Sequence, residues 1–145
     1  MILLSACLAG VPCRYDGGTN TVPALALLAA RGEAIPVCPE VLGGLAVPRV
    51  PCERQPDGRV LDRDGADRSE AFARGARRAL EICLAQGCDS AVLKARSPSC
   101  GAGVVYDGSF SHVCVPGDGV FAALLRARGI PVQTEEEYLQ RNREE

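Results

Sequence analysis

The chain has 145 residues, which fits one domain, and hydrophobic residues make up 47% of it, so it can bury a core. Its formal net charge of -2 argues against nucleic-acid binding through bulk electrostatics, because that binding needs a basic surface. No apolar run is long enough to span a membrane.

The first half of the chain predicts two strands separated by a helix. A short apolar run that stops at a loop containing Gly and Pro predicts a strand at residues 2–5. An Ala- and Leu-rich stretch that ends at a glycine predicts a helix at 22–31, and a second strand follows at 34–37. Residues 38–66 are rich in Pro and Gly, so we expect a loop there with one minor strand near Val60.

The second half of the chain continues this alternation. Apolar residues at helical spacing over 68–86 predict the longest helix, and a third strand follows at 90–93. The pair Asp107-Gly108 indicates a hairpin between strands at 104–106 and 110–115. The remaining expected elements are a helix at 119–128, a strand at 131–133, a helix at 135–140 and a frayed tail at 141–145. The pattern predicts a single-domain α/β fold, with a mostly parallel sheet and helices on both faces.

The eight cysteines indicate either a disulfide-rich secreted domain or an intracellular metal or redox protein. Leu4–Cys7 resembles a bacterial lipoprotein cleavage site. However, no basic start and only a few apolar residues precede it, whereas an export signal needs both features at greater length. We therefore expect a cytoplasmic protein whose thiols are reduced or bound to metal.

Three cysteines stand at the ends of predicted strands. Cys7 follows the first strand, Cys38 follows the second directly, and Cys100 lies in the loop after the third. Their separations match no zinc ribbon or ferredoxin run, in which ligands come in tight pairs. Sites in open α/β sheets form at the carboxyl ends of the strands, and neighbouring strands are only about 5 Å apart. These three thiols can therefore surround one small cluster.

The other five cysteines have simpler explanations, with one exception. Cys83 lies on the apolar stripe of the long helix, Cys88 follows the end of that helix, and Cys114 alternates with valines in a strand. Cys52, in the Pro-rich loop, is a bystander or a labile thiol. Cys13 shares a loop with the first strand-end cysteine, so it remains open as a fourth ligand.

The same loops carry polar groups that a cluster site would use. Residues 97–103 resemble an anion-cradling turn, in which successive backbone N–H groups point into a concavity. Arg14, Lys94 and Arg96 can offset the negative charge of a thiolate-bound cluster, although each can also be ordinary solvated surface. Glu40, two residues after a strand-end cysteine, is the candidate base, and its alternative role is an acid at a helix N-terminus.

Short motifs stand in a fixed order over nearly the whole chain. They are Ser5–Leu8, Cys13–Gly17, Cys38–Leu45 with Pro48-Arg49, Leu93-Lys94 with Arg96–Gly101, Tyr106–Phe110 and Gly117–Val120. Together they resemble the bacterial thiouracil desulfidase family, long catalogued as a domain of unknown function. One departure is visible: where relatives commonly have Pro-Pro-Ala-Glu, this chain has Val50-Pro51-Cys52-Glu53, so Cys52 has no inherited role.

The resemblance implies a 4Fe-4S cluster held by three cysteines, which leaves one iron open, and conversion of thiouracil-type bases to uracil with release of hydrogen sulfide. The ligands carried over by motif are Cys7, Cys38 and Cys100. Glu40 is then the acid/base residue that deprotonates the attacking water, and Ser97 is the assisting serine.

The expected partner is a small thio-heterocycle, and we assign Arg14, Lys94 and Ser99 to substrate binding. The particular substrate and the oligomeric state stay open.

Two other classes of protein are alternatives to a desulfidase. Thiol phosphatases and arsenate reductases separate their Cys and Arg by five residues after the first strand, whereas six residues lie between Cys7 and Arg14. A non-enzymatic module, either structural zinc or a carrier of clusters or sulfur, is the alternative that the residues leave open.

Overall fold

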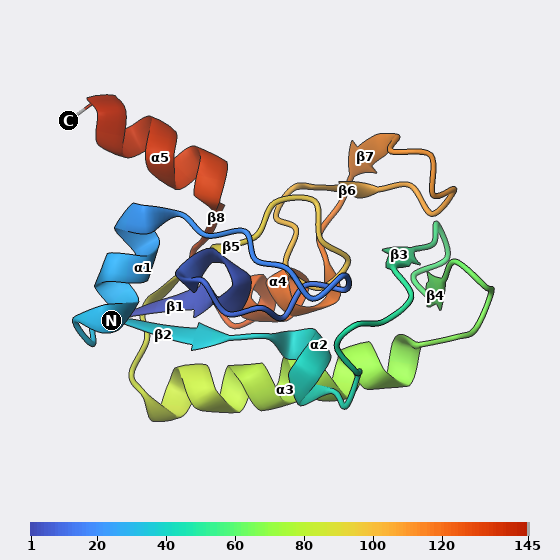
Figure 1. Cartoon of the computed structure of the whole chain (residues 1–145), viewed down its shortest axis with the longest axis horizontal. Coiled ribbons are helices and arrows are strands. Elements are labelled where there is room, and N and C mark those ends of the chain that lie inside the picture. The colour runs from blue at the N-terminus through green and yellow to red at the C-terminus, as the bar shows by residue number, and fades with distance from the viewer. Residues whose placement is uncertain (145) are drawn as a thin grey trace.

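The computed structural model describes residues 1–144 and has a four-stranded parallel sheet at its centre (Figure 1). The strands are β1 (Ile2–Ser5), β2 (Ala34–Val37), β5 (Ser90–Leu93) and β8 (Val132–Thr134), and their order across the sheet is β2-β1-β5-β8. All three neighbouring pairs are parallel. The predicted α/β class and the parallel sheet are therefore confirmed.

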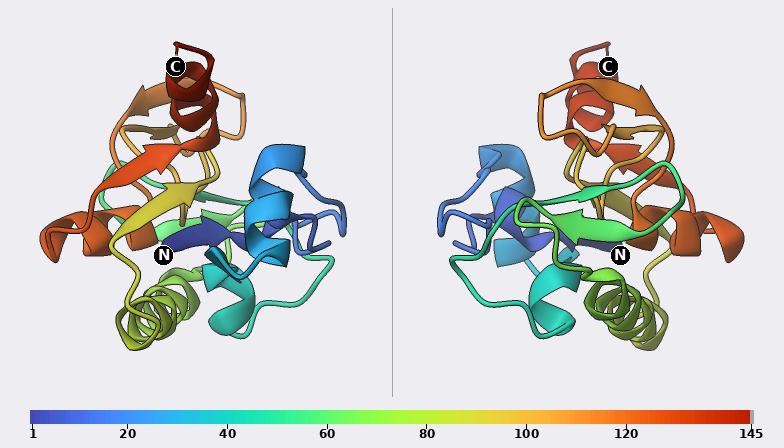
Figure 2. Two further views of the ribbon diagram at one scale, coloured as in Figure 1. Left: turned by 90° about the vertical axis from the view of Figure 1, so that its left-hand side faces the viewer. Right: turned by 90° about the vertical axis from the view of Figure 1, so that its right-hand side faces the viewer.

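Helices cover both faces of this sheet (Figure 2). On one face lie α2 (Pro39–Leu42), α3 (Ser69–Ala85) and α4 (Val120–Ala127), and on the other lie α1 (Pro23–Ala30) and α5 (Glu135–Glu144). Consecutive strand residues supply the two cores, since successive side chains on a strand point to opposite faces. Leu3 packs with α3 and α4, whereas Leu4 packs with α1.

The helix α2 sits unusually close to α3. A Cβ atom on Gly43 would lie 2.0 Å from the Ala71 carbonyl oxygen, and one on Gly75 would lie 1.8 Å from the Pro39 carbonyl oxygen. Only glycine fits where two backbones touch in this way. The pair Gly43 and Gly75 therefore allows α2, which directly follows β2, to rest on the backbone of α3.

Two small antiparallel hairpins complete the fold and lie together at the end of the molecule opposite the N-terminus (Figure 1). One joins β3 (Cys52–Arg54) to β4 (Val60–Asp62), and the other joins β6 (Val104–Tyr106) to β7 (Cys114–Pro116). Among the helices of residues 1–144, none combines the length and the apolarity that crossing a membrane requires.

The structure corrects several predicted elements. The predicted loop 38–66 contains α2 and β3 in addition to the expected strand near Val60. The expected hairpin is confirmed, but the predicted start of its second strand at residue 110 is wrong, because β7 begins only at Cys114. The Glu53 carboxylate accepts hydrogen bonds from the backbone N–H groups of Gly108 and Phe110, at 3.0 and 3.1 Å, which holds this segment as a loop instead of a ladder.

The C-terminal helix was predicted too short. It runs to Glu144, so the expectation of a frayed tail is wrong for residues 141–144, and Glu145 lies outside the described residues. Its start agrees with the prediction because Thr134 and Glu137 form a capping box. Each side chain accepts a hydrogen bond from the backbone N–H of the other residue, at 3.1 and 3.0 Å.

Candidate active site

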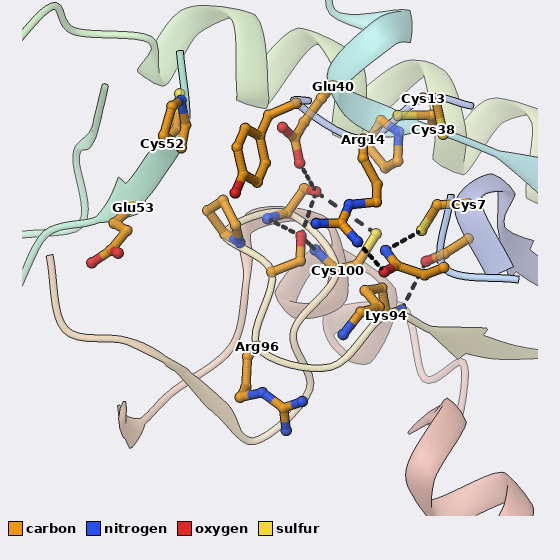
Figure 3. A pocket seen from close by; sticks show the side chains of 18 of the residues that line it. Cys7, Cys13, Arg14, Cys38, Glu40, Cys52, Glu53, Lys94, Arg96 and Cys100 are labelled. Carbon is orange, nitrogen blue, oxygen red and sulfur yellow. Dashed lines mark hydrogen bonds between the residues drawn. The ribbon is translucent and has the colours of Figure 1, made fainter. Parts of the chain in front are cut away.

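The carboxyl ends of β1, β2 and β5 open into one cavity of about 450 Å³ (Figure 3). Cys7 lies in the 3-10 turn Ala6–Ala9 directly after β1, Cys38 stands between β2 and α2, and Cys100 lies in the loop that follows β5. All three line the cavity, as the strand-end argument predicted, because β1 pairs with both other strands.

A fourth thiol, that of Cys13, lies between two of these. It hydrogen-bonds with the thiols of Cys38 and Cys7, and these bonds lower the pKa of Cys38 to about 7 and also lower the pKa of Cys7. The same bonds, with burial, raise the pKa of Cys13 itself. Cys100 is fully buried, and desolvation raises the pKa of its thiol. Of these four thiols, Cys7 and Cys38 therefore have lowered pKa values, and Cys13 and Cys100 have raised ones.

The Cys7 sulfur also has an amide partner that the sequence did not reveal. Asn20 Nδ2 donates to Cys7 Sγ at 3.4 Å, and Asn20 Oδ1 accepts from Arg14 Nη1 at 2.9 Å. A guanidinium can only donate, so Arg14 fixes which end of the amide faces the sulfur. Asn20 lies in a loop without periodicity, and no local pattern would have singled it out.

Glu40 is held on the cavity wall by two partners. Arg49 Nε donates to Glu40 Oε1 at 3.2 Å, and the Ser99 hydroxyl donates to Glu40 Oε2 at 2.9 Å. Although Glu40 lies in the first turn of α2, its carboxylate binds these two side chains, and the helix-end role is not the one observed. Sequence reasoning had assigned no role to Arg49.

The guanidinium of Arg49 ties three segments together around Glu40. Besides the carboxylate, it donates to the carbonyl oxygens of Cys13 at 2.9 Å and Ala46 at 3.1 Å. Its side chain is only 9% exposed, and that of Glu40 is 15% exposed. The loop that carries Cys13 and the helix that carries Glu40 are therefore joined through one buried cation.

The turn that carries Cys100 differs from the anion cradle that the sequence suggested. The N–H groups of Ser99 and Cys100 donate to Ser97 Oγ at 3.2 and 3.1 Å, and the N–H of Gly101 donates to the Ser97 carbonyl. These donors are satisfied within the protein, so the prediction of an anion-binding turn is wrong. Ser97 instead shapes the turn and lies 3.0 Å from the Ser99 hydroxyl.

The three cationic residues predicted for the site, Arg14, Lys94 and Arg96, all line the cavity, but each also has a partner. Lys94 lies 3.8 Å from Glu135, Arg96 pairs with Glu136 at 2.9 Å, and Arg14 contacts Asp16 at 3.1 Å. The positive charge of Lys94 lowers the pKa of Cys7, whereas Arg96 points away from the thiols (Figure 3). Burial raises the pKa of Glu135, which accepts hydrogen bonds from the Ala95 N–H.

The remaining cysteines divide as expected. Cys83 and Cys88 are buried in the core, and Cys114 is exposed. Cys52 lines the cavity wall, where burial raises the pKa of its thiol to about 12.

The donor set suits an iron–sulfur cluster. Thiolates are soft ligands that favour iron–sulfur clusters and zinc. A cubane presents its irons at separate corners, and the cavity of about 450 Å³ that the three thiols line has the room for such a group.

Taken together, the fold and the site define an α/β protein with a cysteine-lined cavity and a fixed carboxylate at the sheet edge. A family model for 2-thiouracil desulfurase matches residues 2–137, and the chain belongs to this family. It is 36% identical over 146 residues to the uncharacterized protein YbbK of Bacillus subtilis (strain 168), covering 94% of this chain and 97% of that protein.

A solved structure is also closely similar to this chain. It is that of TudS, described as a [4Fe-4S]-dependent thiouracil desulfidase, with 47% identity and a TM-score of 0.89, covering 96% of this chain and 93% of that one.

Proposed function

We propose that this chain is a desulfidase that removes sulfur from thiouracil-type compounds with a 4Fe-4S cluster held by Cys7, Cys38 and Cys100. The observation that carries the proposal is the meeting of these three thiols in one cavity, with the Glu40 carboxylate fixed on its wall. The family membership and the likeness to TudS support the reaction and the cofactor.

The three cysteines would hold the cluster, and Asn20 supports one of them. Its amide donates to Cys7 Sγ, a contact that stabilises a thiolate and orients it. When bound, a cluster with one iron free of protein thiolate supplies a soft Lewis acid for the thiocarbonyl sulfur. Arg14 and Lys94 place positive charge beside the negatively charged thiolates and beside the substrate.

Glu40 moves the proton in this proposal. A carboxylate can accept about four hydrogen bonds, so Glu40 keeps acceptor positions free for a water after binding Arg49 and Ser99. It takes a proton from that water as the oxygen bonds to the thiocarbonyl carbon. The C–S bond then breaks, and the two protons of the water leave with the sulfur as hydrogen sulfide.

Ser99 and Ser97 form a short donor chain that orients this base. The single Ser99 hydroxyl proton points to Glu40 Oε2, so Ser97 is the donor in the 3.0 Å contact between the two hydroxyls. The main contact of Ser99 is therefore with Glu40, and Ser97 Oγ accepts hydrogen bonds from the two backbone N–H groups of the turn.

The substrate in this proposal is a small thio-heterocycle. The reduced thiols suit the cytoplasm, where thiols are kept reduced.

The test is anaerobic reconstitution followed by quantification of iron, zinc and sulfide. We expect brown protein with about four irons and four sulfides per chain, the stoichiometry of a cubane. The variants Cys7→Ser, Cys38→Ser and Cys100→Ser should each lose the cluster. Cys83→Ala is the matched control, because its thiol is buried in the core and does not line the cavity.

Two outcomes would contradict the proposal. Colourless protein with one tightly held zinc and no sulfide would identify a structural metal site. Loss of the cluster in Cys13→Ser as well would mean a fourth thiolate ligand, and then no iron would be open to the substrate.

A further inference from the structure

The ring side chains of this protein gather at the cavity. The chain has three Phe, three Tyr, one His and no Trp. Phe72 and Phe121 are buried in the core, whereas the cavity is lined by four of these seven rings, namely Tyr15, Tyr106, Phe110 and His112. Three of these four are close in the chain. Tyr106 is the last residue of β6, and Phe110 and His112 lie in the connection from β6 to β7.

This connection, residues 107–113, which we call the ring loop, is held in an unusual conformation. Phe110 and His112 have φ values of 58° and 60°, in the left-handed region that bulky residues rarely adopt. Such conformations persist only where surrounding contacts impose them, and they cluster at functional sites. The His112 ring also meets the Tyr106 ring edge-on, with their centroids 5.8 Å apart.

The contact that imposes the conformation is a buried carboxylate on β3. Glu53 is only 9% exposed, and its Oε1 accepts the N–H groups of both Gly108 and Phe110. Gln55 Nε2 adds a bond to the Gly108 carbonyl at 3.2 Å. Burying a charged group is costly unless it is hydrogen-bonded, so these bonds position Glu53 and the loop together.

The ring loop and the three proposed ligand thiols, those of Cys7, Cys38 and Cys100, lie on different sides of the same cavity. In Figure 3, Glu53 lies on the side away from Cys7, with the cavity between them. A flat heterocycle whose sulfur points to the thiols would therefore turn its ring toward the loop. Aromatic side chains bind such rings by stacking, and this contact does not depend on the sulfur.

We infer that the ring loop recognises the planar ring of the substrate, with Phe110 as the stacking contact and Glu53 as the residue that positions it. The inference rests on the proposed desulfidase function and adds a selectivity to it. The site should favour aromatic thio-heterocycles over thiocarbonyl compounds that have no flat ring. Phe110 would be a binding residue and Glu53 a positioning residue.

The experiment compares the holoenzyme with Phe110→Leu and Phe110→Tyr on matched probes. The substrates are 2-thiouracil and 5,6-dihydro-2-thiouracil, which share the thiocarbonyl but differ in the flat aromatic ring. Calorimetry with uracil, which has no sulfur, measures ring binding separately from the chemistry. Iron and sulfide content is checked in every sample. Tyr138→Leu is the control, because it removes a ring that does not line the cavity.

We expect Phe110→Leu to raise the KM for 2-thiouracil and the Kd for uracil by about tenfold, the scale of one base-stacking contact. The KM for the dihydro compound should rise by less than the KM for 2-thiouracil, and the cluster content should stay close to wild type. Phe110→Tyr should keep wild-type affinity because it keeps the ring. Glu53→Gln should raise the same two constants, since a neutral amide oxygen is a weaker acceptor for the two N–H groups.

Three results would overturn the inference. An unchanged Kd for uracil in Phe110→Leu would remove the stacking contact. Equal losses for the two thiones would mean that Phe110 shapes the cavity without reading the ring. A Glu53→Gln protein that binds uracil like wild type would remove its positioning role. Absence of turnover in wild-type holoenzyme would instead refute the proposed function, and the uracil measurement would still decide on the ring loop.

Discussion

Arg49 offers the sharpest test of how this site is held together. Replacing it by Met removes one partner of a mostly buried ion pair and leaves Glu40 Oε1 and the Cys13 carbonyl without the hydrogen bonds that Arg49 donates. Breaking such a pair from one side costs about 3 to 5 kcal/mol when both groups are buried. Because both side chains keep some exposure, we expect about 3 kcal/mol, which for a chain of this size lowers Tm by about 10 °C.

The same variant should separate loading of the cluster from catalysis. Arg49 contacts none of the three proposed ligand thiols directly, so iron and sulfide content should remain near wild type. Release of sulfide should fall by about 10- to 100-fold, the scale for losing a group that orients a functional residue. Arg49→Lys keeps the charge without the planar fork, so we expect a smaller loss of Tm and of activity than in Arg49→Met.

The assay is anaerobic single-turnover release of sulfide from 2-thiouracil, with iron content and thermal unfolding measured on the same samples. Arg77→Met is a suitable control, since the pair that Arg77 forms with Glu70 is exposed and such pairs contribute little. If Arg49→Met kept the wild-type Tm and rate, the guanidinium would not be the tie between α2 and the Cys13 loop.

Four further predictions concern single groups. Glu40→Gln should leave the cluster intact and lower sulfide release by about a hundredfold or more, whereas full activity would remove it as the base. Ser99→Ala should lower release by about 10- to 100-fold through Glu40, and Ser97→Ala should have a smaller or comparable effect without loss of iron. Hydrogen bonding, first from the Ala66 N–H, lowers the pKa of Asp62, so its stabilisation is present above about pH 4 and is lost as the pH falls through the folded value. Denaturant unfolding should therefore show Asp62→Asn less stable than wild type at pH 7, with a difference that closes in acid, and a difference that persists at low pH would contradict this.

Much of the frame of this protein could be predicted from local patterns. Strands such as Ile2–Ser5 and Ser90–Leu93 are buried on both faces and appear as uninterrupted apolar runs. Because their carboxyl ends meet at one edge, the gathering of Cys7, Cys38 and Cys100 followed from their positions alone. Their roles as ligands remain a proposal.

The contacts that adjust the site could not be predicted in this way. Asn20, Arg49 and Glu53 act on groups that are several to many residues away in the sequence, and the turn and breaker residues beside them do not indicate which groups their side chains will contact. A long-range contact also explains why the predicted strand at 110–115 starts later than expected, although its sequence alternates as a strand does. The Glu53 carboxylate, on β3, accepts hydrogen bonds from the N–H groups of Gly108 and Phe110, and these bonds hold the segment as a loop.

The close contact between Gly43 and Gly75 means that a substitution at position 75, outside the cavity, would change the geometry of the active site. A methyl group at either site would strike backbone atoms of the opposite helix, which no change of rotamer can relieve. The short helix would have to lift as a unit, and Cys38 and Glu40, at its first residues, would shift in the same direction. Cys38 and Glu40 would then keep their distance from each other, but both would lose their alignment with Cys7 and Cys100. Position 75, on a helix that contributes nothing to the cavity lining, is therefore expected to tolerate as little change as the cysteines themselves.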